Sequence, residues 1–346
     1  MIDEYHHAVS ALSGFGITHN EIKTLDIGLI NSTYLVINSD SKFILQHVNS
    51  MFPDSIHEDI NAVTCHLHDK NISCPRLIRT VEDGLFLNRD GQTWRMFNYI
   101  DGISFNTVDD PTVAWEAGTL LAEFHEALQD LDYEFRSVRP GVHDTQKHLT
   151  ALMNALNIHQ DHVNYREILK LGNEILDFAT RLPILTPCPE RTVHGDPKIN
   201  NILFNKNSQQ GICLIDFDTL GKMPLVLELG DALRSWCNPG GEDIDKTTFS
   251  IDTFKNALQG YASISHEYII EEEGRSLVDA THIIYLELAA RFCADALNES
   301  FFSWDPNRFE SHSQHNQIRA RGQLNALKSL VSQSNDANKI LNAVFT

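Results

Sequence analysis

Residues 192–218 read TVHGDPKINNILFNKNSQQGICLIDFD, and this stretch decides the fold of the larger part of the chain. It contains two short apolar runs joined by the polar turn 205–211. Apolar runs on either side of a polar turn predict a β-hairpin. Such a hairpin would place Asn201 and Asp216 opposite each other at its open end, with Asp196 one loop away.

We therefore expect Asp196, Asn201 and Asp216 to converge in one small volume. Mg²⁺ prefers hard oxygen ligands and retains several waters, so two carboxylates and an amide suit it. Phosphoryl transfer needs a metal at the phosphate oxygens and a base that orients the attacking hydroxyl. The spacing His-x-Asp-x-x-x-x-Asn, followed by an Asp after an apolar strand, supplies these parts. In the alternative interpretation, which is common for single Asp and Asn residues, the three merely cap turns or begin a strand.

The composition excludes several classes of protein. The chain has 346 residues, of which 42% are hydrophobic, so it can bury a sizeable core. Its 27 Lys and Arg against 47 Asp and Glu give a net charge of −20, which disfavours nucleic acid and anionic membrane surfaces as partners. The first residues lack a secretory signal, and no apolar run is long enough to span a membrane. Six scattered cysteines without a CxxC pair indicate reduced thiols, so we predict a cytoplasmic protein.

Two parts of the chain differ in character. Short strands, expected at 32–37, 42–47, 85–87 and 93–100, and one helix at 53–70 make up the first third. After Gly102 the pattern becomes helical, and only residues 191–217 interrupt it. The expected helices cover 112–128, 143–156, 165–181, 251–261, 277–297 and 314–331. This order predicts an α+β protein with two unequal lobes that meet near Asn98 to Gly102.

The motif HGDPKIN with Asn201, and IDFD at 215–218, resemble the HGDxxxxN and IDF-type motifs of the aminoglycoside phosphotransferase and choline kinase superfamily. Further stretches, spread over about residues 27–330, resemble N-acetylhexosamine 1-kinases, which phosphorylate the anomeric hydroxyl of N-acetylated hexosamines. They are GLINSTYLV, FILQHVNSMF, INAVTCHL, WRMFNYIDG, HDTQKHL, KINNILF, IDFDT, LGDALR and LELAARF. The resemblance implies a two-lobed protein-kinase-like fold, with a small β-rich nucleotide-binding N-lobe over 1–97. A larger helical C-lobe over 98–346 would contain the catalytic β-hairpin segment and the acceptor pocket.

The same resemblance implies roles for individual residues. They are Asp196 as catalytic base, Asn201 and Asp216 as Mg²⁺ ligands, Asp218 as support for the metal or the substrate, and His194 and Asp231 as braces of the catalytic loop. A purely structural role is the alternative for His194 and Asp231.

Residues 27–34 occupy the place of a turn that covers the phosphates of ATP, the expected co-substrate. The candidates for phosphate contacts in this turn are Gly28, Asn31, Ser32 and Thr33. An ordinary hairpin turn explains the same residues equally well.

Protein kinases carry a phosphate-pairing Lys on the third strand, and Gln46 stands where that Lys is expected. A neutral Gln can hydrogen-bond phosphate but lacks the charge, and Lys42 lies four residues earlier on the same strand face. Glu58 and Asp59 on the following helix are either the partner carboxylate of a phosphate-pairing cation or solvated surface.

Residues 96–100 are expected to form the hinge whose backbone meets the adenine edge, with Met96 and Asn98 as candidate contacts. The alternative is an edge strand that ends in a turn.

The acceptor must reach Asp196, so helices of the second lobe should line its pocket. Arg234 and Arg291 are candidate contacts to the hydroxyls of a sugar. Arg291 and Asp295 are also an i, i+4 pair, for which a surface salt bridge is the plain alternative. Aromatic residues that either stack on a sugar or belong to the core are Trp236, Phe301, Phe302 and Trp304. Pairs of histidines occur, but no cysteine or carboxylate set completes a zinc site with them.

These observations predict a small-molecule kinase that transfers the γ-phosphoryl group of ATP to a hydroxyl, most readily that of an N-acetylhexosamine. Aminoglycoside, homoserine-like and amino-alcohol acceptors are alternatives within the same chemistry. A nucleotide-binding pseudoenzyme is an alternative of another class, favoured only by Gln46.

Overall fold

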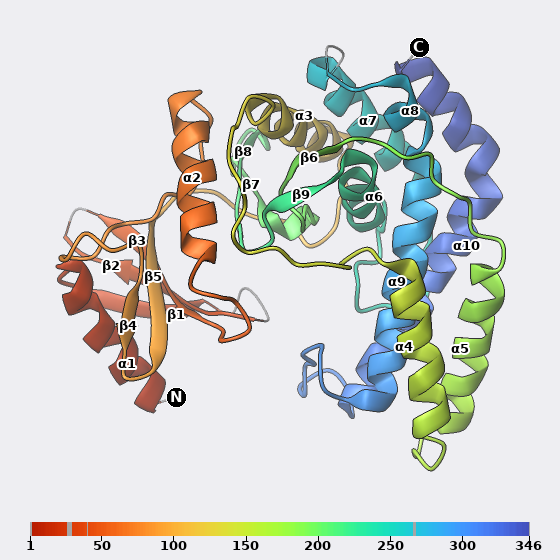
Figure 1. Cartoon of the computed structure of the whole chain (residues 1–346), viewed down its shortest axis with the longest axis horizontal. Coiled ribbons are helices and arrows are strands. Elements are labelled where there is room, and N and C mark those ends of the chain that lie inside the picture. The colour runs from red at the N-terminus through yellow and green to blue at the C-terminus, as the bar shows by residue number, and fades with distance from the viewer. Residues whose placement is uncertain (1, 26–29, 40, 266–267, 346) are drawn as a thin grey trace.

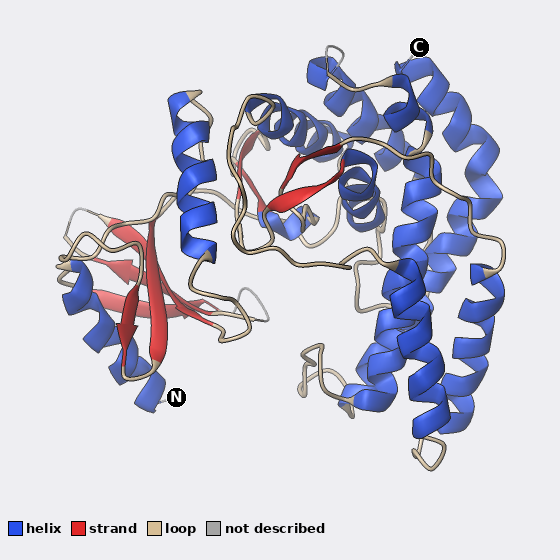
Figure 2. Cartoon of the chain, viewed as in Figure 1, coloured by secondary structure: helices blue, strands red, loops and turns tan. Residues whose placement is uncertain are grey.

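The computed structural model describes residues 2–25, 30–39, 41–265 and 268–345. A small antiparallel sheet with two helices lies at one end of the molecule, and a larger, mostly helical part lies at the other (Figures 1 and 2). This arrangement confirms the predicted α+β fold with a β-rich and a helical lobe. The division after residue 97 is our proposal.

The sheet of the first part has five strands in the order β1-β2-β3-β5-β4, all antiparallel to their neighbours. The strands are β1 (Glu21–Leu25), β2 (Ser32–Ile37), β3 (Lys42–Val48), β4 (Leu87–Arg89) and β5 (Gln92–Asn98). Helix α1 (Ile2–Leu12) and the short 3₁₀ turn η1 (Ser13–Phe15) supply apolar residues to a small core with one face of the sheet. Helix α2 (Ile56–Asp69) packs its apolar side into the core of the second part.

The second part is built around helix α9 (Leu277–Asn298), which packs against α4, α5, α6 and α10. The other helices are α3 (Pro111–Ala127), α4 (Thr145–Ile158), α5 (Tyr165–Ala179), α6 (Leu225–Trp236), α7 (Ile251–Ser265), α8 (Glu271–Arg275) and α10 (His312–Phe345). Helix α9 is apolar nearly all round because neighbours surround it, whereas α5 has one apolar stripe and one solvated face.

Two small β-ladders interrupt these helices. Strands β7 (Ile202–Phe204) and β8 (Gly211–Leu214) form the predicted hairpin, and the 3₁₀ turn η2 (Ile199–Asn201) leads into it. Strand β6 (Glu190–Val193) pairs with β9 (Gly221–Pro224), a strand that the sequence did not predict. The sequence GKMP of β9 carries no strand signal, so tertiary pairing with β6 forms it.

Most predicted elements are confirmed within a few residues, while α1, β1, β9 and α6 were not predicted. Helix α10 runs well beyond its predicted end at 331, because Ala337 and Leu341 are buried against neighbouring helices. All six cysteines are free thiols, and four of them are buried, as expected. None of the helices in the described parts of the chain combines the length and apolarity that a membrane span requires.

Candidate active site

The β7–β8 hairpin brings the two predicted metal-ligand positions together. Ile202 pairs with Leu214, and the Ile215 amide donates to the Asn201 carbonyl at 2.9 Å. Asn201 and Asp216 therefore stand at the open end of the hairpin, as the sequence predicted. Two segments separated by the polar turn 205–211 meet here because backbone pairing sets their register.

The loop that begins at His194 carries the predicted catalytic motif, and His194 itself is fully buried. Its Nε2 donates to the Ile215 carbonyl at 2.9 Å, while its Nδ1 accepts from the Asp196 amide at 3.3 Å. Burial lowers the pKa of His194, which favours the neutral ring that this pattern requires. His194 is therefore a positioning residue that ties the loop to the hairpin, and its burial excludes contact with substrate.

Helix α6 braces the same loop. Both oxygens of the buried Glu228 carboxylate accept backbone amides, from His194 and from Gly195, each at 2.9 Å. Near the end of the helix, the Ser235 hydroxyl accepts the Ile199 amide at 3.1 Å, and the indole of Trp236 donates to the Pro197 carbonyl at 2.9 Å.

Asp231, predicted to brace this loop, does not do so, because its carboxylate pairs with Arg234 at 2.8 Å. Trp236 is buried against the loop rather than presented to a sugar.

Glu228→Gln is expected to destabilise the protein by about 1–3 kcal/mol, because the amide NH₂ would face a backbone N–H that loses its acceptor. Turnover should fall as the catalytic loop loosens. Thermal or urea unfolding together with kcat measures both effects. Glu126→Gln, an exposed carboxylate on α3, is the matched control. Unchanged stability of Glu228→Gln would show that the two amides find another acceptor.

Asp196 lies at the centre of a small polar network. Its Oδ2 accepts Lys198 Nζ at 2.7 Å and Asn201 Nδ2 at 3.1 Å. The side chains of Asp196 and Lys198 are 26% and 35% exposed, so the carboxylate can meet a ligand. Burial by itself would raise the pKa of Asp196, but the Lys198 ammonium outweighs it and holds that pKa below its ordinary value. The carboxylate is therefore ionised at neutral pH.

Asp216 and Asn201 supply the oxygens that fit a divalent cation. Asn201 Nδ2 donates to the backbone carbonyl and to the carboxylate of Asp196. The Oδ1 of Asn201 is therefore available as a ligand. Asp216 has φ +68°, an uncommon conformation for a non-glycine residue, and this turns it away from the strand that precedes it. Burial and the neighbouring Asp218 carboxylate raise the pKa of Asp216 to about 6. A carboxylate that resists ionisation next to a like charge is well suited to a cation ligand.

Asp218, also predicted at the metal, is engaged otherwise in this structure. Its carboxylate forms a bidentate ion pair with Arg95 on β5, in which Arg95 Nη2 lies 2.8 Å from Oδ2. Asn31 Nδ2 donates to the same Oδ2 at 2.7 Å. Asp218 thus links residues 194–218, the catalytic segment, to strand β5 and to the turn that precedes β2.

The predicted phosphate turn is seen in part. Gly28 lies outside the described residues, and Ser32 begins β2. Thr33 is buried, and its hydroxyl accepts Gln46 Nε2 at 3.2 Å. Thr33 and Gln46 are therefore occupied with each other rather than open toward a ligand.

The predicted hinge is partly engaged with its own lobe. Met96 is buried in the small core, and its carbonyl accepts the Ile78 amide at 2.7 Å. The Asn98 amide donates to the Arg76 carbonyl at 3.2 Å, and its side-chain Oδ1 accepts the Arg76 amide at 2.6 Å. The Met96 carbonyl is thus not free for adenine, and the Tyr99 amide that follows Asn98 donates to the Lys42 carbonyl at 3.3 Å.

The two carboxylates predicted on α2 do not reach a phosphate-pairing cation. Asp59 is buried rather than solvated, and it accepts the backbone amides of Arg136 and Ser137 at 2.9 and 2.8 Å. Glu58 pairs with the Arg136 side chain at the surface.

Arg234 and Arg291, the candidates for acceptor binding, differ in their surroundings. Arg234 is buried and fully committed, to Asp231 and to Glu242, each at 2.8 Å. Arg291 lies over the rings of Phe301 and Phe302, and within the described residues its guanidinium has no hydrogen bond or ion pair. Burial lowers the pKa of Arg291. Arg291 therefore has donors free for a ligand.

The predicted alternative for Arg291, an ion pair with Asp295, is wrong. Asp295 instead accepts the backbone amides of residues 300–302, at 2.8–3.1 Å, and so fixes the start of the loop that follows α9.

A sequence model of the phosphotransferase enzyme family matches residues 21–263, which include the sheet, the catalytic loop and the hairpin. The chain belongs to this family. Membership confirms the predicted superfamily, the two-lobed protein-kinase-like fold and an ATP-dependent phosphotransferase that acts on an alcohol group.

The phosphotransferase is similar to several known proteins. A homoserine kinase from Chelativorans sp. (strain BNC1) is 22% identical over 267 residues, which cover 77% of this chain and 76% of that protein. The structure of a microcompartment-associated aminopropanol kinase matches with a TM-score of 0.64 and 15% identity, over 96% and 98% of the two chains. An amicoumacin kinase solved with AMP-PNP and Ca²⁺ matches with a TM-score of 0.60 and 13% identity, over 94% and 96%. At such identities the structural matches show the fold alone.

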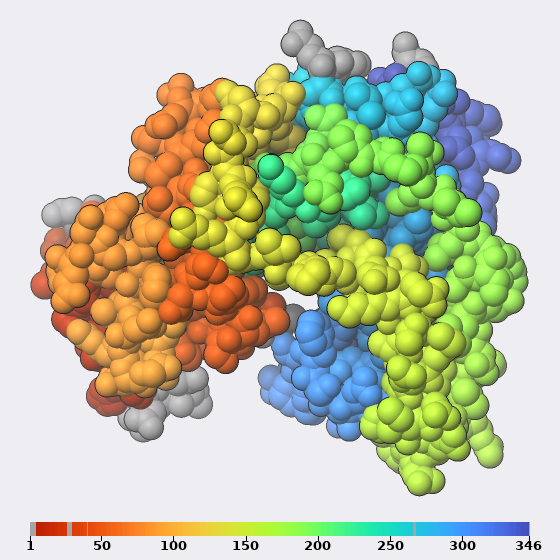
Figure 3. Space-filling view, in the orientation of Figure 1, coloured from red at the N-terminus to blue at the C-terminus, as the bar shows by residue number. Residues whose placement is uncertain are grey.

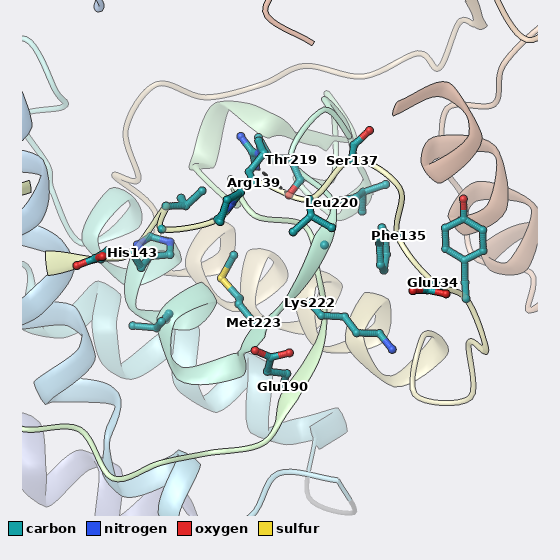
Figure 4. Close-up of a pocket in the computed structure, with 18 of the residues that line it drawn as sticks. Glu134, Phe135, Ser137, Arg139, His143, Glu190, Thr219, Leu220, Lys222 and Met223 are labelled. Carbon is teal, nitrogen blue, oxygen red and sulfur yellow. Dashed lines mark hydrogen bonds between the residues drawn. The ribbon is translucent and has the colours of Figure 1, made fainter. Parts of the chain in front are cut away.

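A cavity of about 700 Å³ lies between residues 132–144 of the phosphotransferase and its strand β9 (Figure 4). Arg139 borders this cavity, and its Nη2 donates to the Thr219 carbonyl at 3.0 Å. None of Asp196, Asn201 and Asp216 lines it. This cavity is therefore separate from the place where the three residues converge. Figure 3 shows a recess between the sheet lobe and the blue segment that joins α9 to α10.

Sequence reasoning missed four residues of this phosphotransferase that the structure places beside the catalytic segment: Arg95, Arg139, Lys198 and Glu228. Three of them carried a usable signal. Arg95 and Glu228 are charged residues inside apolar runs, WRMF and LVLEL, where a charge needs a buried partner. Lys198 lies within the motif itself. Arg139 lies in an irregular segment, and nothing in its local sequence distinguishes it.

Proposed function

We propose that this phosphotransferase is a Mg²⁺-dependent kinase that transfers the γ-phosphoryl group of ATP to a hydroxyl of a small polar acceptor. The single observation that carries the proposal is the convergence of Asp196, Asn201 and Asp216 around one partly open volume. The amicoumacin kinase solved with AMP-PNP and Ca²⁺ supports a nucleotide with a divalent cation in such a site.

Asp196 would orient the acceptor hydroxyl by accepting its hydrogen bond. The Lys198 ammonium keeps this carboxylate ionised, so it is a weak base that holds the hydroxyl in line rather than one that removes its proton early. This suits phosphoryl transfer, in which positioning and charge stabilisation provide most of the catalysis. Lys198 faces Asp196 and, at longer range, Asp216, so its charge also lies where phosphate oxygens would gather.

Asn201 Oδ1 and the Asp216 carboxylate would hold the cation. A divalent cation in such a site neutralises the phosphate oxygens and links the nucleotide to the protein. Across the described residues there is no cluster of three or more His, Cys, Asp and Glu side chains suited to a metal. A site with two protein ligands, completed by phosphate oxygens and waters, is typical of Mg²⁺. Asp218 remains a third proposed ligand, available only if Arg95 releases it.

For the acceptor we propose an N-acetylated hexosamine, on the sequence stretches that resemble N-acetylhexosamine 1-kinases. A homoserine-like amino alcohol is the second candidate, and the curated relative, a homoserine kinase, favours it. Arg291 is the acceptor contact that we propose, because its donors are free. Both candidates present oxygens to a guanidinium, through hydroxyl and carbonyl groups or through a carboxylate.

Phosphate transfer from ATP across a panel of N-acetylhexosamines, homoserine, amino alcohols and aminoglycosides tests this function. We expect one class to be phosphorylated with Mg²⁺, and we expect excess EDTA to abolish the transfer because the phosphate charge is no longer neutralised. Nucleotide binding without transfer to any acceptor would favour the pseudoenzyme. Full activity in EDTA would contradict the metal site.

A further inference from the structure

Gln46 leaves the sheet lobe without the expected phosphate-pairing Lys, and the row of side chains beside it contains another cation, Arg95. Thr33, Gln46 and Arg95 are direct neighbours across β2, β3 and β5, so their side chains share one face of the sheet. Gln46 Nε2 donates to the Thr33 hydroxyl at 3.2 Å, and Gln46 Oε1 accepts Arg95 Nε at 2.9 Å. Gln46 thereby holds the guanidinium of Arg95 in a fixed orientation.

The far end of this row meets the catalytic segment. Arg95 and Asp218 form a bidentate ion pair in which the two side chains are only 1% and 3% exposed. Asn31, from the turn that precedes β2, donates to the same carboxylate at 2.7 Å. The Asp218 carboxylate, two residues after Asp216, thus binds a cation from the sheet and an amide donor from the predicted phosphate turn.

The other cations of the described sheet strands lie elsewhere. Lys23 pairs with Glu21 at the surface, Lys42 lies over the ring of Tyr99, and Arg89 bonds to Ser10 and Ser13. Among the described strand residues, Arg95 is the cation that reaches the catalytic segment.

We infer that Arg95 binds the phosphates of the nucleotide in place of the missing Lys, with Asp218 as its partner while no nucleotide is bound. A planar guanidinium matches phosphate oxygens as well as it matches a carboxylate, so a phosphate would replace Asp218 and the Arg95 guanidinium would stay paired. Asp218 would then be released toward the divalent metal ion that Asn201 and Asp216 would hold. Neither buried charge would be left without a partner. The inference rests on the proposed function and names the residue that binds the phosphates.

The test compares the affinities of ADP and adenosine, measured calorimetrically with Mg²⁺, in wild type, Arg95→Lys and Arg95→Met. Only ADP carries phosphates, so the ratio of the ADP affinity to the adenosine affinity isolates the contribution of the phosphates to binding. We expect Arg95→Met to lower this ratio by about tenfold or more. Arg95→Lys should lower it by a smaller factor, because Lys keeps the charge but lacks the two parallel N–H donors of the guanidinium. Arg89→Lys, on the neighbouring strand β4, is the matched control and should leave the ratio unchanged.

An unchanged ratio in both variants would overturn the inference, and so would an equal loss of ADP and adenosine binding. If Arg95→Met does not fold, Arg95→Lys decides, because its ammonium still pairs with Asp218. A wild-type protein that binds neither ligand would contradict the proposed function instead.

Discussion

Asp196→Asn is expected to lower the turnover number by about two to four orders of magnitude, the size of effect typical for the loss of a positioned general base. The amide retains the shape of the carboxylate but loses the charge that orients the acceptor hydroxyl and that pairs with Lys198 at 2.7 Å. Nucleotide affinity should change little, because the lost interaction acts mainly in the transition state.

Steady-state kinetics with the acceptor identified by the panel, together with calorimetric ADP binding, measure both quantities. Asp252→Asn, an exposed carboxylate on α7, is the control for a change of one charge. Transfer by Asp196→Asn at the wild-type rate would refute the mechanism. A parallel loss of ADP affinity and turnover would instead assign Asp196 to nucleotide binding.

Gly195→Ala is the second change with a large expected effect, because it disrupts the catalytic loop through its backbone. Gly195 has φ +83°, and a Cβ built there would lie 2.1 Å from the Thr219 carbonyl oxygen. That oxygen also accepts Arg139, and the Thr219 hydroxyl donates to the His194 carbonyl at 2.8 Å, so neither chain segment can move away freely. We expect a loss of about 3 kcal/mol or more in stability, since the clash adds to backbone strain of about 1–2 kcal/mol.

Gly91→Ala separates the two contributions. Gly91 also has a positive φ, +76°, but no atom lies within 4 Å of its added Cβ. The Gly91→Ala variant should therefore lose only the stability that corresponds to backbone strain. Urea unfolding of both variants gives the free energies, and kcat shows whether the Gly195 variant retains activity. Equal destabilisation of the two proteins would mean that the catalytic loop relaxes around the methyl group.

The hairpin was predictable because its information is local. Two apolar runs and a polar turn set the pairing of Ile202 with Leu214, and this pairing places Asn201 opposite Asp216 without reference to the rest of the chain. Helix α6 was not predicted, because its run LVLEL is apolar almost without interruption and shows no clear helical stripe. Its role in holding the loop through Glu228 was therefore not evident either.

By itself, the sequence determined the two-part α+β architecture, the family motifs and the grouping of Asp196, Asn201 and Asp216, since all of these depend on short spacing along the chain. The tertiary structure alone decided which distant residues complete the site. Asp218 pairs with Arg95, which lies 123 positions away in the sequence, and Glu228 accepts the backbone amide of His194, which lies 34 positions away. A buried charge or backbone amide must find a partner, and the packing of the lobes determines which partner lies within reach.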